Sequence, residues 1–193
     1  KKTISIPKPI LKWVGGKTQI LHELIESFPK NMSNYHEIFL GGGSVLIALL
    51  INIKQNNIKL NGSIYAYDLN PQLINMYTNI QSNHNELYDI IQILIKEYNE
   101  CTEPIENSKL EKKPRKIWNN LKDEDKTKSK EHYYYWIRQK YNKMNINEKN
   151  SVNGSSIFIF LNKTCFRGLF RMGPNGFNVP YGNYKNPEIV NKE

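Results

Sequence analysis

Cysteine and histidine are both scarce in this 193-residue chain. The two cysteines, Cys101 and Cys165, lie far apart and form no CxxC pair, which excludes a disulfide framework and favours a reducing interior. The four histidines do not cluster with them: His22, His36, His84 and His132. Zinc sites need closely spaced cysteine, histidine or acidic ligands, so we expect neither a structural metal nor metal catalysis.

Long apolar runs are also missing. The longest, Val45 to Ile53, is interrupted by Asn52 and is far shorter than the roughly 20 residues that cross a bilayer. The N-terminus is basic but carries no apolar stretch of the signal-peptide type. We therefore expect a soluble, cytoplasmic protein with no membrane partner.

Acidic residues are outnumbered, 18 to 27, by lysine and arginine, which gives a formal net charge of +9. Such an excess is typical of proteins that bind a polyanion. A solvated lysine-rich surface would give the same balance, since lysine, asparagine and isoleucine are all plentiful, and charge alone leaves both interpretations open. With 39% hydrophobic and 23% charged residues, the composition is that of a globular protein.

The first third of the chain predicts alternating strands and helices. A helical face spans Thr18 to Phe28, and a short strand from Tyr35 to Leu40 ends at three glycines. Ser44 suits the N-cap of a helix from Val45 to Ile53. A second strand from Ile64 to Asp68 precedes a helix from Gln72 to Ile80, opened by Asn70 and Pro71. This order predicts the α/β class and half of a doubly wound sheet, with a ligand crevice at the strand ends.

The pattern changes beyond residue 70. An amphipathic helical stripe from Leu87 to Tyr98 leads into a polar connector from Cys101 to Glu131. A helix is predicted over Tyr133 to Met144, whereas Ile157 to Leu161 suits either a buried strand or a buried helix. The segment GPNG (173–176) lies between two apolar runs and predicts a hairpin. We expect a domain boundary near residue 70 and a mostly helical second domain that ends in this hairpin.

The glycine turn FLGGGS (39–44) predicts a ligand site, because glycine lets backbone amides approach a ligand at a helix N-terminus. Asp68, at the end of the second strand, is placed to accept hydrogen bonds from a ribose diol. Alternatively, Asp68 caps the helix that begins at Pro71.

The segment WVGGK (13–17) is a second candidate ligand contact. GKT (16–18) matches the end of a phosphate-binding P-loop, but Leu11 occupies the position of the first required glycine, which disfavours a nucleotide triphosphatase. Lys17 could neutralise a ligand carboxylate, and Trp13 could cover an adenine ring.

Five ordered motifs resemble the Dam-type adenine-N6 DNA methyltransferase family. These are KWVGGK (12–17), EIFLGGGS (37–44), YAYDLN (65–70), YYYWIRQKYN (133–142) and LNKTCFRGLFR (161–171), the last followed by FNVPYG (177–182) and YKNP (184–187). The resemblance implies an incomplete Rossmann-like methyltransferase sheet with an inserted, mostly helical target-recognition domain that carries a β-hairpin. The cofactor half would span residues 1–70, the recognition domain 71–188, and 189–193 would begin the return to the methyltransferase domain. It also implies a helix over Ile157 to Leu161.

The resemblance implies S-adenosylmethionine as cofactor and double-stranded DNA as substrate. The cofactor would be held by Trp13, Lys17, Phe39, Gly41, Gly43, Ser44 and Asp68. The DNA would be contacted by Lys163, Phe166, Arg167, Arg171, Asn178, Pro180 and Lys185.

Within this hairpin, Arg171 aligns with the guanine-reading arginine of the family and Phe166 with its intercalating aromatic residue. The partner of Arg167 stays open, because relatives vary there. Pro180 and the Asn178 backbone would approach the duplex from the return strand, and the implied target begins with guanine-adenine, as in GATC. Basic residues interleaved with aromatics suit DNA contact in their own right. Composition alone would equally allow a surface hairpin anchored by its phenylalanines.

The sequence holds no Asp-Pro or Pro-Pro pair, so the Asp-Pro-Pro-Tyr motif that orients the flipped adenine in this family is absent. NVPY (178–181) has valine where that motif needs proline. We therefore expect no catalytic residue in this chain and a second polypeptide, or a further C-terminal segment, that carries the motif. The alternatives are a non-catalytic, sequence-specific DNA-binding module and a nicotinamide- or nucleotide-dependent enzyme.

Overall fold

A computed structural model describes residues 8–102, 118 and 120–190. Most of the predicted connector, 103–117 and 119, lies outside the described residues, as do 1–7 at the start of the predicted cofactor half and 191–193 in the predicted return segment. The chain divides into two compact units, residues 1–74 and 75–193, and the division falls inside a long helix. The sequence-based boundary was placed near residue 70.

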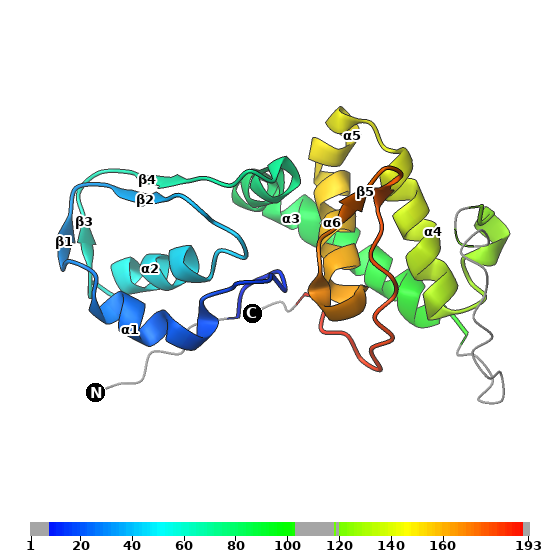
Figure 1. Ribbon diagram of the computed structural model, residues 1–193, viewed down its shortest axis with the longest axis horizontal. Coiled ribbons are helices and arrows are strands. Elements are labelled where there is room, and N and C mark those ends of the chain that lie inside the picture. The colour runs from blue at the N-terminus through cyan, green and yellow to red at the C-terminus, as the bar shows by residue number, and fades with distance from the viewer. Residues whose placement is uncertain (1–7, 103–117, 119, 191–193) are drawn as a thin grey trace. The chain divides into compact units, whose positions relative to one another are not determined.

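Unit 1 is built around a strand–helix–strand arrangement (Figure 1). Its elements are η1 (Thr18–Ile20), α1 (Leu21–Glu26), β1 (Asn31–Met32), β2 (Tyr35–Glu37), α2 (Ser44–Lys54), β3 (Lys59–Leu60), β4 (Ile64–Ala66) and the start of α3 (Pro71–Glu100). β1 pairs with β3 and β2 with β4, both in parallel. α2 is therefore the crossover that two parallel strands require.

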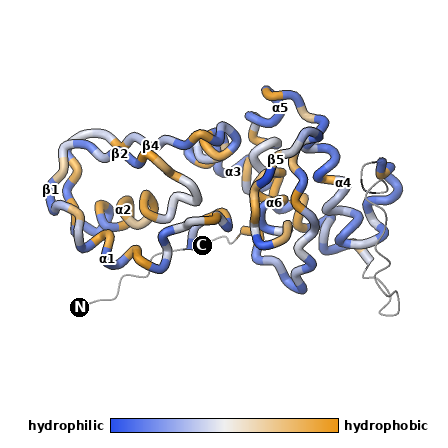
Figure 2. Tube along the Cα trace, in the orientation of Figure 1, coloured by the Kyte–Doolittle hydropathy of each residue, from blue (hydrophilic) through white to orange (hydrophobic). Residues whose placement is uncertain are grey.

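The core of unit 1 lies along α2. Ala48 and Leu49 are fully buried. α1 packs on α2, and both helices lie on the same side of the β2–β4 pair (Figure 1). Figure 2 shows the apolar colour along α2, as its sequence SVLIALLINIK predicts.

Two expectations for this unit need correction. The strand predicted over Tyr35 to Leu40 ends at Glu37, although Leu40 still donates its N–H to the Tyr67 carbonyl at 2.8 Å. Ser44 does not cap α2 with its side chain. It is the first helical residue, preceded by Gly43 in the left-handed region at φ 69°, and its hydroxyl accepts the Lys17 backbone N–H at 3.3 Å instead.

Unit 2 is mostly helical. After the rest of α3 come η3 (Asp123–Asp125), α4 (Lys130–Lys143), α5 (Ile146–Asn150), α6 (Val152–Thr164), η4 (Phe166–Gly168), β5 (Met172–Gly173) and β6 (Gly176–Phe177). β5 and β6 form an antiparallel hairpin around residues 173–176, as predicted. The helix predicted over 133–144 is α4.

The buried segment Ile157 to Leu161 is helical and lies in α6, so the implication of the family resemblance is confirmed over the strand alternative. Burial on all sides removes the hydrophobic periodicity that would have distinguished a helix, since all five residues are buried. Ser151 begins this helix by accepting the Gly154 N–H at 3.1 Å. α6 packs against α4 and α5 and so provides the centre of unit 2.

α3 joins two predicted helices, 72–80 and the stripe 87–98, into one element with a single non-helical residue, Asn83. In the apolar stripe of the second half, Leu87, Ile91, Leu94 and Tyr98 are buried. None of the described helices has the length and apolar character needed to span a membrane.

Candidate functional site

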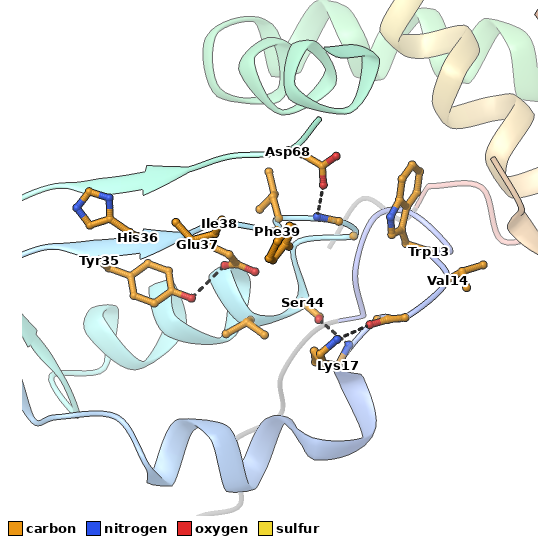
Figure 3. A pocket seen from close by; sticks show the side chains of 16 residues that line it. Trp13, Val14, Lys17, Tyr35, His36, Glu37, Ile38, Phe39, Ser44 and Asp68 are labelled. Carbon is orange, nitrogen blue, oxygen red and sulfur yellow. Dashed lines mark hydrogen bonds between the residues drawn. The ribbon is translucent and has the colours of Figure 1, made fainter. Parts of the chain in front are cut away.

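A cavity of about 490 Å³ lies at the carboxyl ends of β2 and β4 (Figure 3). Six of the seven predicted cofactor residues line it: Trp13, Lys17, Phe39, Gly41, Ser44 and Asp68. The seventh, Gly43, does not line it but supplies the left-handed turn before α2. Parallel strands end at the same edge of a sheet, which is where the glycine turn and the strand-end carboxylate meet.

Asp68 connects the two strand ends. Its Oδ2 accepts the backbone N–H of Gly41 at 2.9 Å, and its Oδ1 accepts that of Asn70 at 2.9 Å. Asp68 does not cap α3: the Oδ1 of Asn70 does so, accepting N–H groups from Gln72 and Leu73 at 3.1 and 3.3 Å. The helix-capping alternative for Asp68 is therefore wrong.

The glycine turn and the 13–17 loop fit closely against each other. A β-carbon on Gly41, whose φ is 50°, would lie 3.1 Å from Cδ1 of Trp13, and one on Gly42 would lie 3.0 Å from Cβ of Trp13. Glycine here leaves room for the indole. On the far side of this loop, the Lys17 ammonium donates to the Gly15 carbonyl at 3.0 Å.

Tyr35, His36 and Glu37 also line the cavity and were not selected from the sequence. The Tyr35 hydroxyl donates to Oε2 of Glu37 at 3.1 Å. Burial is the main cause that raises the pKa of Glu37, and burial followed by the Glu37 charge raises the pKa of Tyr35. The signal for Glu37 was available, because a carboxylate at the end of β2 faces the same crevice as the one that follows β4.

In unit 2, the hairpin presents the predicted DNA-contact residues on its exposed side. Arg171, Asn178 and Pro180 are exposed, as are Phe166 and Arg167. Nε and Nη2 of Arg171 donate to Asn178, to Oδ1 at 2.6 Å and to the carbonyl at 3.4 Å. Arginine carries five N–H donors, so three are not used in these two bonds.

Phe166 and Arg167 form a stacked pair beside the hairpin. The Arg167 guanidinium lies 5.2 Å from the Phe166 ring centroid, and Arg167 has a φ of 56°. A left-handed conformation is uncommon for a long side chain and concentrates at functional positions. Lys163, at the end of α6, is half-buried, and Lys185 is exposed.

A second cavity, of about 360 Å³, lies between the hairpin and α4. Its lining residues are Trp118, Tyr135, Arg138, Asn142, Arg171, Asn175, Phe177, Asn178 and Pro180. Arg138 lies over the Tyr135 ring at 4.5 Å and donates to the Val179 carbonyl at 3.2 Å. Burial lowers the pKa of Arg138 from its usual value. Tyr135, Arg138 and Asn142 of this lining belong to the motif YYYWIRQKYN (133–142), but the sequence did not single them out as site residues.

The family model of D12 class N6 adenine-specific DNA methyltransferases matches residues 13–193. The chain belongs to this family. It is 35% identical over 192 residues to the type II methyltransferase M.MjaIII of Methanocaldococcus jannaschii, which covers 96% of this chain and 56% of that protein. It is 30% identical to the retron Ec67 DNA adenine methylase of Escherichia coli, covering 95% and 50%. The DNA adenine methylase of Escherichia coli K12 is 26% identical, covering 96% and 51%.

Membership in the D12 family confirms the resemblance drawn from the five motifs. The chain spans about half the length of the curated relatives it matches. Within the part that the structure describes, no group of three histidine, cysteine or acidic side chains is placed to hold a metal ion.

The raised pKa of Glu37 predicts a pH-dependent cost of folding. A carboxyl group whose pKa is raised by folding stabilises the native state fully below its unfolded pKa, and this contribution is lost as pH rises through the folded value. Glu37→Gln should therefore gain stability relative to the parent chain as pH rises from about 4 to 7. Urea unfolding at several pH values measures this difference. A stability difference independent of pH would show that folding does not raise the pKa of Glu37, and Glu23→Gln, at an exposed position of α1, serves as control.

Proposed function

We propose that this chain binds S-adenosylmethionine and double-stranded DNA as the cofactor and target-recognition parts of a site-specific adenine-N6 DNA methyltransferase. The observation that carries the proposal is the Asp68–Gly41 hydrogen bond, at the cavity where six of the seven expected cofactor residues gather. We further propose that the strand–helix–strand arrangement of unit 1 is part of a Rossmann-like sheet.

The cavity suits a ligand of this size and charge. Its volume of about 490 Å³ falls within the range of small-molecule sites, about 300–1,000 Å³. Asp68 would accept hydrogen bonds from the ribose hydroxyls with the lone pairs that its two backbone bonds leave open. Lys17 would pair with the carboxylate of the methionine moiety, and Trp13 would cover the adenine ring. When bound, S-adenosylmethionine supplies the activated methyl group.

The hairpin would read the target from the major groove, which admits a two-stranded ribbon. Arg171 would donate to guanine O6 and N7 with the N–H groups that its bonds to Asn178 do not use. Phe166 would stack within the duplex, and Lys163 and Lys185 would contact phosphates. The proposed target begins with guanine-adenine, as in GATC.

Methyl transfer would require the Asp-Pro-Pro-Tyr motif from a second polypeptide or a further segment, because the 193 residues do not contain it. A second candidate function is a non-catalytic DNA-binding module, which would use the exposed residues of the hairpin without any methyl transfer. The two candidates differ in whether methylation appears when the missing motif is supplied.

The cofactor site is tested by Asp68→Ala. Loss of the carboxylate removes a ribose acceptor and the bond to Gly41, and should weaken S-adenosylmethionine binding by about 1–3 kcal/mol in calorimetry. Asp89→Ala, at an exposed position of α3, is the matched control and should bind as the parent chain does. A folded parent chain that takes up no S-adenosylmethionine would rule out the proposed site.

The chemistry is tested with a labelled methyl donor and GATC-containing DNA. The purified chain alone should transfer no methyl group, because none of its residues supplies the motif that orients the adenine amino group. Addition of a polypeptide carrying Asp-Pro-Pro-Tyr from a D12 relative should restore transfer. Methylation by the chain alone would contradict the first statement, and persistent inactivity after complementation would favour the binding module.

Sequence reading is tested by Arg171→Ala. A bidentate contact to guanine discriminates by about 1–3 kcal/mol, so the variant should lose affinity for guanine-adenine duplexes far more than for duplexes with that guanine replaced. Lys163→Ala and Lys185→Ala should each weaken binding to all duplexes alike. Each should also lower the slope of log binding constant against log salt concentration by about one in magnitude. Fluorescence anisotropy at several salt concentrations measures both. An equal loss on all duplexes would make Arg171 a phosphate contact.

A further inference from the structure

The return arm of the hairpin, residues 177–182, forms hydrogen bonds along both of its edges. Its even-numbered residues bond to the backbone of residues 164–171, which precede the hairpin turn. The Asn178 N–H donates to the Arg171 carbonyl at 3.1 Å, the Pro180 carbonyl accepts the Phe166 N–H at 2.8 Å, and the Gly182 N–H donates to Thr164 at 2.9 Å. These three bonds are all backbone-to-backbone, and the last two flank the antiparallel bridge between Cys165 and Tyr181.

The odd-numbered residues bond to side chains of α4 instead. The Val179 carbonyl accepts the Tyr134 hydroxyl at 2.8 Å and Nη1 of Arg138 at 3.2 Å. The Phe177 N–H donates to Oδ1 of Asn142 at 2.7 Å, and its carbonyl accepts Nδ2 of Asn142 at 2.9 Å. The spacing of four residues on α4 places Tyr134, Arg138 and Asn142 on one face, so this face occupies the place of a third strand.

Asn142 differs from the other two because it satisfies the donor and the acceptor of one residue together. A side-chain amide carries the same N–H and C=O groups as the backbone, so Asn142 pairs with Phe177 as a neighbouring strand residue would. The approach depends on glycine at position 176, where φ is 92° and a β-carbon would lie 2.4 Å from Oδ1 of Asn142.

The position of Phe177 fixes that of Asn178, the next residue along the arm. Oδ1 of Asn178 accepts the Nε–H of Arg171 at 2.6 Å, and the Asn178 backbone N–H donates to the Arg171 carbonyl. A chain of direct hydrogen bonds and one peptide linkage therefore runs from Asn142 to the Arg171 guanidinium.

We propose that Asn142 is a positioning residue for sequence recognition: by holding both backbone groups of Phe177, it orients Asn178 and sets the direction in which Arg171 presents its remaining N–H donors. This inference rests on the proposed function of Arg171 as the guanine reader. Tyr134 provides the matched comparison, because the Val179 carbonyl keeps Arg138 as a donor when the Tyr134 hydroxyl is removed.

The first test compares Asn142→Ala and Tyr134→Phe in the full chain, with duplexes that carry or lack the guanine. Asn142→Ala should lower discrimination at least about threefold, with less than about a twofold change on duplexes lacking the guanine. Tyr134→Phe should preserve discrimination. Adding Asn142→Ala to Arg171→Ala should cause no further loss, because the two residues act in one chain of contacts. Additive losses, or an equal loss on all duplexes, would overturn the proposal.

The second test needs no DNA. In ¹H–¹⁵N spectra near pH 6, the Nε–H of Arg171, assigned by its disappearance in Arg171→Ala, should exchange slowly in the parent chain and in Tyr134→Phe. It should exchange faster in Asn142→Ala, with the spectrum otherwise that of a folded chain. If the exchange rate of the Arg171 Nε–H is the same in Asn142→Ala as in the parent chain, the positioning role is overturned whatever the DNA result. If Asn142→Ala speeds this exchange but the parent chain shows no preference for guanine, the positioning role stands and the proposed reading of DNA is rejected.

If Asn142→Ala does not fold, Asn142→Asp replaces it. The carboxylate keeps the acceptor for the Phe177 N–H but faces the Phe177 carbonyl without a donor, so Arg171 Nε–H exchange should be fast at neutral pH. Protonation restores an O–H donor. Exchange should therefore approach the parent behaviour as pH falls to about 4 and below, where an ordinary aspartate carboxyl is protonated, and a difference from the parent chain that does not vary with pH would contradict the proposal.

Discussion

The hydrogen bond from the Gly41 amide to the Asp68 carboxylate joins the segments that follow two short parallel strands, beyond the last backbone bond between them. β2 and β4 are three residues long, and β1 and β3 two. A carboxylate that accepts backbone N–H groups from two different turns gives charge-assisted bonds, which are stronger than those of a peptide ladder. The glycine turn, the Trp13 indole against it and the left-handed entry to α2 all depend on the position that this contact fixes for Gly41.

The two candidate sites use the same device in different units. In unit 1 the Asp68 side chain extends a short parallel pair beyond its last strand residue, and in unit 2 the Asn142 side chain bonds to the free edge of a short antiparallel pair. Strands this short contribute few backbone hydrogen bonds, so polar side chains supply the missing partners. Asp68 and Asn142 therefore stabilise the local fold, and in the proposed function they also contribute to recognition of the cofactor and of the DNA.

Features set by local chemistry could be predicted from the sequence, whereas features set by distant contacts could not. The GPNG hairpin, the glycine turn and α4 follow from turn residues and periodicity. Ser44 was expected to cap a helix because serine precedes an apolar run, but the 13–17 loop recruits its hydroxyl. The roles of Glu37 and Asn142 depend on what stands opposite them: Tyr35 near the first, and an arm 35 residues further along the chain for the second.

The alternation of buried and exposed residues along 177–180 separates two kinds of constraint within one short segment. Side chains at Phe177 and Val179 are buried, while those at Asn178 and Pro180 are exposed. Substitution at positions 178 and 180 does not change a side chain that is buried against α4, whereas insertion or deletion of one residue would exchange the two sets and bury the exposed ones. Packing on α4 therefore constrains the length of this segment more tightly than it constrains the residue types at positions 178 and 180.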